Sequence, residues 1–200
     1  MQLSVKNDLT KRITALAIVL LSATALSACA PQAAAVPGDF PNLTLAETKS
    51  PSQLLRNDAA ARLPSAMILE VLEAEDTSVA CLSEEDDPDG TIRSWHSTVD
   101  VLIAEMGDTT VKSLVADLTQ SFVDQEWVAR DLGGNSHVTK KLLESSTSLS
   151  DIEISGFLPN PDQASTALEE NVDQPTVRIG VHGPCVRTAG ARSDEVRALE

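Results

Sequence analysis

The sequence predicts an α+β fold, with two helices packed on one face of a mostly antiparallel sheet of about five to six strands. Apolar residues recur every three or four positions between Val111 and Phe122, as in an amphipathic helix, whereas residues 92–103 alternate as in a half-buried strand. Four shorter strand-like runs follow the helix. The order helix, two strands, helix and four short strands is typical of the α+β class.

Earlier segments carry signals for the first helix and the first strand. A helix is expected to start at Ser50-Pro51, because proline suits the first turn, and to end at Pro64. A strand is expected over 67–72, with a helical continuation through Glu75 as the alternative. The charged residues 83–90 include proline and glycine and predict a turn that leads into the long strand.

Asp108 or Thr109 is expected to cap the amphipathic helix, which ends near Trp127. A glycine-rich turn at 133–135 lies between two short alternating runs and predicts a β-hairpin. The last expected strands are 151–157 and 176–182, with an acidic loop at 162–175 between them.

The start of the chain has the pattern of a signal peptide. An apolar run, broken only by small polar residues, covers residues 13–25 and follows the basic residues Lys6, Lys11 and Arg12. The run is too short to span a bilayer. It therefore predicts export rather than a membrane-spanning helix.

The apolar run ends at Leu26-Ser27-Ala28-Cys29, which resembles the lipobox of bacterial lipoproteins. Small side chains at Ser27 and Ala28 admit a peptidase, and Cys29 offers a nucleophilic thiol. The resemblance implies that a diacylglyceryl group is attached to Cys29 and that residues 1–28 are removed. Because two acyl chains anchor stably, the expected location is the extracytoplasmic face of the cell membrane. An ordinary secretory signal with an accidental cysteine is the alternative.

Charge and aromatic content narrow the classes of partner. The chain carries a formal charge of −15, and removing three basic residues and one acidic residue with residues 1–28 takes it to −17. Such a surface is repelled by phosphates, which argues against nucleic acid and against membrane binding through basic patches. The chain has only three phenylalanines, two tryptophans and no tyrosine. Base-stacking platforms and sugar-binding sites depend on aromatic side chains, so this composition argues against both.

Composition divides the chain into four parts. Prolines at positions 31, 37 and 41 block regular structure and indicate a tether between the lipid and the folded part. The mature chain is long enough for one domain with a real core. The expected parts are a signal peptide at 1–28, an acylated N-terminus and flexible tether at 29–50, a single α+β domain at 51–187 and a mobile tail at 188–200.

Several of these features together are similar to small uncharacterised lipoproteins of actinobacteria. They are the lipobox, the proline-rich tether, the Ser-Trp pair after the acidic turn, the helix ending near Trp127 and the late Gly-Pro-Cys. This resemblance implies no activity and no cofactor. It therefore supports the expected location at the cell membrane but does not indicate a function.

Cys81 and Cys185 remain once Cys29 is assigned to the lipid. An exported protein lies where thiols oxidise, so we expect a structural disulfide between them. A redox-active pair is the alternative, but it lacks the Cys-x-x-Cys spacing.

The acidic turn is a candidate calcium site, because hard cations bind clustered carboxylates. Aligning Gly90 with the glycine of an EF-hand loop places Glu85, Asp87 and Asp89 at ligand positions. The last ligand of such a loop is a glutamate, but this chain has His96 at that position. An EF-hand is therefore not predicted, and a solvated turn or a weak calcium site remains. No metal site is assigned.

No catalytic motif occurs in the sequence. His96, His137 and His182 lie in or beside expected strands without metal-ligand spacing. Trp95 and Trp127 are expected in the core, with an exposed partner-binding tryptophan as the alternative.

The preferred hypothesis is a non-catalytic, lipid-anchored envelope protein that binds a small ligand or an envelope protein. A cell-wall hydrolase or transferase built from His96, His182 and carboxylates, and a calcium-dependent adhesion module, are the alternatives.

Overall fold

The structure is a computed structural model that describes residues 40–104, 110–159 and 174–200. Predictions for the signal peptide, Cys29, the cap at 108 or 109 and residues 160–173 of the acidic loop lie outside these ranges. The elements are α2 (Leu45–Ala61), η1 (Ser65–Met67), β1 (Ile68–Val71), β2 (Glu75–Ala80), β3 (Ile92–Ile103), α3 (Val111–Val123), β4 (Val128–Gly134), β5 (Val138–Glu144), β6 (Asp151–Phe157), β7 (Thr176–His182), β8 (Val186–Arg187) and α4 (Asp194–Leu199). The α+β class is confirmed.

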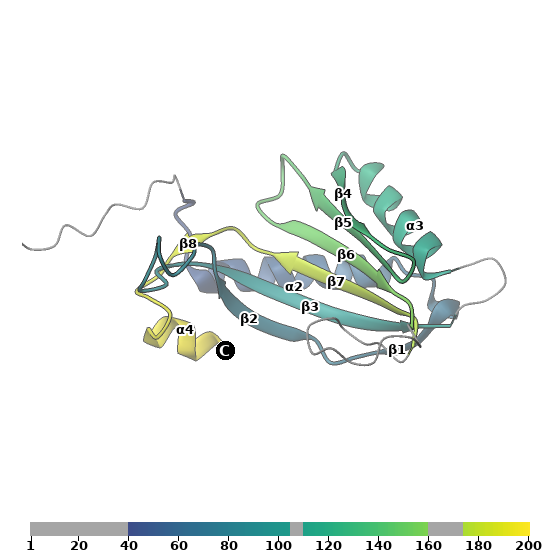
Figure 1. Cartoon of the computed structure of the whole chain (residues 1–200). Coiled ribbons are helices and arrows are strands. Elements are labelled where there is room, and N and C mark those ends of the chain that lie inside the picture. The colour runs from purple at the N-terminus through teal and green to yellow at the C-terminus, as the bar shows by residue number, and fades with distance from the viewer. Residues whose placement is uncertain (1–39, 105–109, 160–173) are drawn as a thin grey trace, which may run out of the picture. The chain divides into compact units, whose positions relative to one another are not determined.

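All eight strands of the described ranges belong to one antiparallel sheet (Figure 1). Its order is β1-β3-β7-β6-β5-β4, and β2 and β8 also pair with β3. β1 and β2 lie along one edge of β3, and β7 and β8 lie along the other. The prediction of five to six strands was too low, because β2 is rich in polar residues and β8 has only two residues. Two helices were predicted, and the structure adds α4.

Alternate residues of the central strands point into the core. Val99 and Val101 of β3, Ile154 of β6 and Ile179 of β7 are buried in one cluster with residues of α2 and α3. The residues between them point to the opposite side of the sheet, because successive side chains alternate along a strand. We call this side the outer face; it carries Glu75 and Thr77 of β2, His96, Thr98 and Asp100 of β3, Asp151 and Glu153 of β6, and Arg178, Gly180 and His182 of β7.

α2 begins at Leu45, earlier than the predicted start at Ser50-Pro51. Thr44 and Glu47 form a capping box: the Glu47 N–H donates to Thr44 Oγ1, and the Thr44 N–H donates to Glu47 Oε2 over 2.7 Å. This local cap outweighs Pro51, which lies inside the helix. The expected tether at 29–50 therefore ends before Leu45.

α3 confirms the helix predicted from the apolar period, with Thr110 as its N-cap rather than residue 108 or 109. The helix contacts β5 and β6. Gly156 of β6 lies beneath it, and a Cβ atom at this position would be 2.6 Å from Val111 Cγ1 and 2.9 Å from Val115 Cγ2. The absence of a side chain at Gly156 therefore sets how closely α3 approaches the sheet.

We expect Gly156→Ala to lower the free energy of unfolding by about 1 to 2 kcal/mol, because the added methyl group overpacks the contact with α3. Urea unfolding followed by circular dichroism measures the change. Gly133→Ala is a comparison for backbone strain without a steric clash, since its φ is +90° and a Cβ atom there meets nothing within 4 Å. A Gly156→Ala protein as stable as the parent would contradict the close packing of α3.

Residues 188–200 were predicted to be a mobile tail, but they contain α4. Val196 of this helix is buried in a second, smaller cluster with Leu45, Trp95 and Val186. Lys49 Nζ also donates to the Leu199 carbonyl oxygen over 2.7 Å. The compact unit accordingly extends through α4 to Glu200 rather than ending at residue 187. The prediction failed because α4 is stabilised by residues far away in the sequence.

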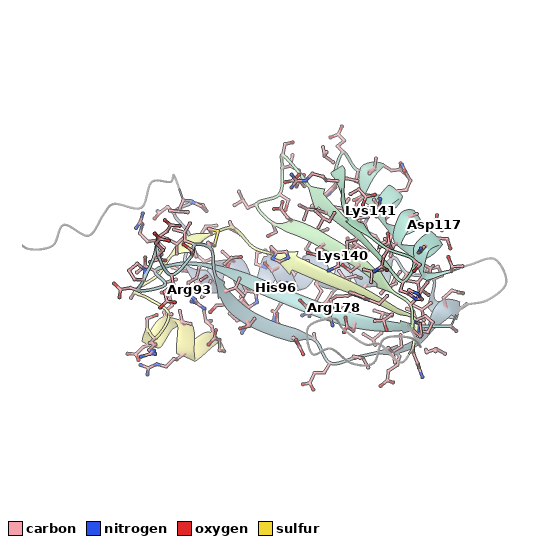
Figure 2. The ribbon with its side chains drawn as sticks, viewed as in Figure 1. Arg93, His96, Asp117, Lys140, Lys141 and Arg178 are labelled. Atoms are coloured by element: carbon pink, nitrogen blue, oxygen red, sulfur yellow. A yellow bond between two sulfur atoms is a disulfide. The ribbon has the colours of Figure 1, made fainter. Side chains whose placement is uncertain are left out.

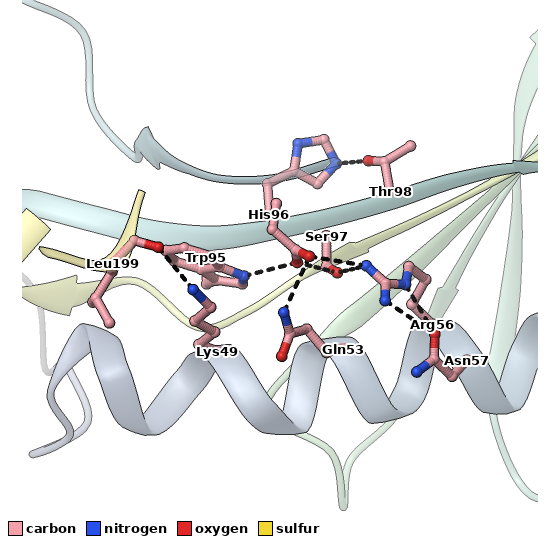
Figure 3. Close-up of polar contacts among 10 residues, drawn as sticks. Lys49, Gln53, Arg56, Asn57, Trp95, His96, Ser97, Thr98 and Leu199 are labelled. Atoms are coloured by element: carbon pink, nitrogen blue, oxygen red, sulfur yellow. Dashed lines mark hydrogen bonds and ion pairs between the residues drawn. The ribbon is translucent and has the colours of Figure 1, made fainter. Parts of the chain in front are cut away.

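A buried polar network joins α2 to β2 and β3 (Figure 3). Arg56 of α2 donates to Ser97 Oγ over 2.7 Å and to Asp76 Oδ2 over 3.2 Å. Asp76 Oδ1 also accepts hydrogen bonds from Ser97 Oγ and from Trp95 Nε1. Trp95 is fully buried, which confirms its prediction as a core residue. The network positions β2, the strand that supplies one wall of the site described below.

The predicted disulfide between Cys81 and Cys185 is present, with their Cα atoms 6.1 Å apart. It joins the residue after β2 to the segment between β7 and β8. The bond spans 104 residues of sequence and therefore closes most of the folded unit into one loop.

Candidate functional site

A pocket of about 380 Å³ opens on the outer face of the sheet. Its charged and hydrogen-bonding side chains come from four strands: Glu75 and Thr77 of β2, His96 and Thr98 of β3, Glu153 of β6, and Arg178 and His182 of β7. Figure 2 labels His96 and Arg178 on this part of the sheet. Figure 3 shows His96 and Thr98 on the side of β3 that faces away from α2. The volume is at the small end of ligand pockets.

Strand register brings these residues together in rows. His96 pairs directly with His182, and Thr98 pairs with Gly180. On the far side of β7, Gly180 pairs with Glu153. Because residues paired across antiparallel strands hold their side chains on the same face, each row places its groups side by side.

Gly180 forms the floor of the hollow. A Cβ atom at this position would be 3.3 Å from His96 Nε2, 3.7 Å from Thr98 Oγ1 and 4.0 Å from His182 Nε2. The Nε2 atoms of both imidazoles therefore lie near the space above Gly180. A residue with a side chain at this position would fill that space.

The rings of His96 and His182 are stacked, with centroids 4.2 Å apart and planes 19° apart. Burial and then the charge of His182 lower the pKa of His96, and Arg178 lowers it further, whereas Glu153 acts in the opposite direction. The lowered pKa favours a neutral His96 imidazole at neutral pH. Its Nε2 lies 3.2 Å from Thr98 Oγ1, within hydrogen-bonding distance.

Arg178 is held by Asp100 of β3 in a bidentate ion pair. Its Nε donates to Asp100 Oδ1 over 2.7 Å, and its Nη2 donates to Asp100 Oδ2 over 2.6 Å. Glu153 accepts a hydrogen bond from Ser155 Oγ through one carboxylate oxygen, Oε1. The positive charge of Arg178 is thus largely offset by Asp100, whereas the second oxygen of Glu153 keeps its acceptor capacity.

The structure brings together two of the three histidines considered from the sequence. His137 lies just before β5, where its Nδ1 is 3.1 Å from the Pro159 carbonyl oxygen, and it does not line the pocket. The pocket therefore meets one condition of the hydrolase hypothesis, a concave site that contains His96 and His182. Among the residues with described positions, however, no carboxylate is hydrogen-bonded to either ring.

In the acidic turn at 83–90, the most buried carboxylate, that of Asp87, accepts hydrogen bonds from the residues just after the turn. Asp87 accepts hydrogen bonds from Thr91 Oγ1 over 2.9 Å and from the Ile92 N–H over 2.7 Å. Within the ranges that the structure describes, no group of three or more His, Cys, Asp or Glu side chains is arranged to hold a metal ion. Asp87 therefore has a structural role, and the alignment with an EF-hand gains no support from the geometry.

A second hollow, of about 420 Å³, is apolar and lies beside α2. Leu43, Leu55, Trp127 and Leu149 contribute to its lining. Trp127 is half-buried and packs against Phe122, with ring centroids 5.4 Å apart, so it is neither fully in the core nor an exposed anchor. Its mainly apolar lining offers few groups that would select one class of ligand. The pocket on the outer face, which is lined by charged and hydrogen-bonding side chains, is therefore the more informative site.

Sequence reasoning missed Glu75, Thr98, Glu153, Arg178 and Gly180 as site residues. A partial signal was present, since polar residues at alternate positions of a strand share one face. Which strands are neighbours, and in which register, cannot be read from those positions alone.

Comparison with known proteins adds no relative: no family model, no curated protein and no solved structure matches this chain. None of the helices described here is both long enough and apolar enough to cross a membrane. The function must therefore be argued from the residues of the site and from the motifs of the sequence.

Proposed function

We propose that this chain is an exported, lipid-anchored envelope protein whose folded unit is a non-catalytic binding module. In this proposal α2 and α3 cover one face of the sheet, and the outer face is left for a ligand. The observation that carries it is the pocket over Gly180, in which polar groups from four strands converge. Polar groups that converge in a concave site are typical of ligand recognition.

Two features support attachment through Cys29. The motif Leu26-Ser27-Ala28-Cys29 has the form of a lipobox, and it follows a basic and then an apolar segment. The chain has three cysteines, and the disulfide uses Cys81 and Cys185. Cys29 is thus the cysteine left for acylation, and a structural disulfide suits an oxidising compartment outside the cytoplasm.

Metabolic labelling with an alkyne analogue of palmitate tests the anchor. We expect the parent protein to be labelled and to fractionate with membranes, whereas Cys29→Ser loses the label, because the diacylglyceryl group needs this thiol. Ser22→Ala changes a small residue within the apolar run and should leave labelling intact. An unlabelled parent protein, or a Cys29→Ser protein that keeps its label, would reject the lipid anchor.

A hydrolase is the second candidate, and the distance of 3.2 Å between Thr98 Oγ1 and His96 Nε2 favours it. A neutral imidazole beside a hydroxyl group can act as its general base. If this pair is catalytic, the purified protein cleaves p-nitrophenyl acetate, and Thr98→Val abolishes the cleavage. Equal hydrolysis by the parent protein and by Thr98→Val would remove this candidate.

A further inference from the structure

The atoms that face the hollow over Gly180 are rich in hydrogen-bond acceptors. Glu75 and Glu153 supply carboxylate oxygens from opposite sides of the pocket, on β2 and β6. Nε2 of His182 lies near the space above Gly180, whereas Nε2 of His96 is within hydrogen-bonding distance of Thr98 Oγ1. A neutral imidazole whose proton is on Nδ1 offers Nε2 as an acceptor. A well-matched ligand should therefore supply donors.

The charges of the pocket favour a positive ligand. The guanidinium of Arg178 is bound by both oxygens of Asp100, which offset much of its charge, and the remaining positive field lowers the pKa of His96. The carboxylates of Glu75 and Glu153 are then in excess among the described lining residues. An anion would face these two carboxylates, which repel it.

A divalent metal ion fits the geometry less well. Two imidazoles bind one metal only when both lone pairs point at it from about 2.1 Å. The rings of His96 and His182 are nearly parallel, with centroids 4.2 Å apart, so their lone pairs run side by side. The absence of a third suitably placed ligand in the described ranges agrees with this conclusion.

We propose that the pocket binds an organic cation through an ammonium or guanidinium group, whose N–H donors bond to Glu75, Glu153 and Nε2 of His182. The inference rests on the proposed binding function and names its ligand class. A volume of about 380 Å³ admits a small molecule or a single basic side chain. Several charge-assisted hydrogen bonds would converge on one group, which gives the site its selectivity.

Binding should weaken as pH falls through the lowered pKa of His96, because a protonated His96 repels a cation. The charged and titratable groups around His96 are Glu75 of β2, Asp100 of β3, Asp151 and Glu153 of β6, and Arg178 and His182 of β7. The lowered pKa of His96 favours the neutral imidazole at neutral pH, so the loss of binding is expected on the acid side.

Calorimetric titration of the full chain with n-butylammonium and n-butylguanidinium tests the proposal, with histidine ring proton shifts followed by NMR. n-Butyltrimethylammonium has the same charge without N–H donors, and it should bind at least about tenfold more weakly. Butyrate and Zn²⁺ are the anionic and metallic probes. We expect the shifts of His96 and His182 to move with the two donor cations and not with butyrate.

Glu153→Gln and Glu75→Gln should each weaken n-butylguanidinium binding at least about tenfold, since each removes a charged acceptor. Glu85→Gln is the matched control, because Glu85 is exposed on the acidic turn, and the same charge change there should leave affinity within about twofold. Gly180→Ala adds a methyl group to the hollow without changing charge, and it should also weaken binding. Melting temperatures identify any variant that fails to fold.

Four results would overturn the proposal: no binding of either donor cation, equal binding of the trimethylated cation, preferential binding of butyrate or Zn²⁺, or an equal loss of affinity in Glu85→Gln. These results do not bear on palmitate labelling at Cys29. Failure of the ligand class can therefore be distinguished from failure of the lipid-anchored function.

Discussion

Replacing Asp76 with alanine is expected to lower the free energy of unfolding by about 3 kcal/mol, because it leaves the Arg56 guanidinium buried without its carboxylate. The side chain of Arg56 is only 8% exposed. Its Nη1 contacts Asp76 Oδ2 at 3.2 Å, and Ser97 accepts the other hydrogen bond of the same nitrogen. Water therefore cannot replace the lost carboxylate without opening the contact between α2 and the sheet.

Asp76 also accepts hydrogen bonds from Gln53, Trp95 and Ser97. Its removal therefore leaves several donors without their acceptor. Burial raises the pKa of Asp76, but hydrogen bonds from Ser97, Gln53 and Trp95 and the charge of Arg56 outweigh it, and the net pKa is lowered. A carboxyl group whose pKa is lowered by folding stabilises the folded state above its ordinary pKa of 3.8. That contribution is lost as pH falls through the lower pKa of the folded state.

Urea unfolding at neutral pH measures the effect, and the melting temperature should fall by about 6 to 12 °C. Asp58→Ala is the matched control, since Asp58 of α2 also pairs with an arginine, the C-cap residue Arg62, but the Asp58 side chain is 56% exposed. An exposed pair of this kind contributes about 1 kcal/mol or less. Asp76→Asn should lie between the two alanine variants, because the amide keeps an acceptor oxygen but loses the charge. Equal stability of Asp76→Ala and Asp58→Ala would show that the buried network does not hold α2.

Local patterns were enough to predict the elements whose sequence period is long and regular. Burial alternates along β3 from Trp95 to Ile103, and α3 repeats its apolar residues along one face, so both were located correctly. The disulfide followed from the cysteine count once the lipobox had used Cys29. The start of α2 was also readable, because Thr44 and Glu47 have the spacing of a capping box, but Pro51 was given more weight.

Features that depend on distant contacts could not be predicted in the same way. α4 has only six residues, and it is held by burial of Val196 beside Leu45 and Trp95, which lie more than 100 residues away. The pocket depends on register: His96 meets His182 only because β3 and β7 pair at that position. A shift of one residue would turn the side chains of one strand to the opposite face. Alternation therefore predicts that these histidines share a face with polar neighbours, but not that they meet.

Removal of the disulfide in a Cys81→Ser/Cys185→Ser protein is expected to lower the free energy of unfolding by about 4 to 5 kcal/mol. The bond closes a span of 104 residues, and in the chain-entropy model a loop of this length restricts the unfolded chain strongly. The same bond holds the segment before β8, and Val186 of β8 packs in the cluster with Trp95 and Val196. Loss of the bond should therefore loosen β8 and α4 before the main core around α3.

Urea unfolding of the parent protein, with and without dithiothreitol, provides the control for this variant. Reduction should bring the parent protein to the stability of the double serine variant, whereas the variant should not respond to reductant, because it has no bond left to break. Hydrogen exchange should show the largest loss of protection in α4 and β8. Two free thiols at Cys81 and Cys185 in protein purified without reductant would contradict the bond. A variant that unfolds at the same urea concentration as the oxidised parent would show instead that the cross-link contributes nothing to stability, and that the second cluster holds the C-terminal segment by packing alone.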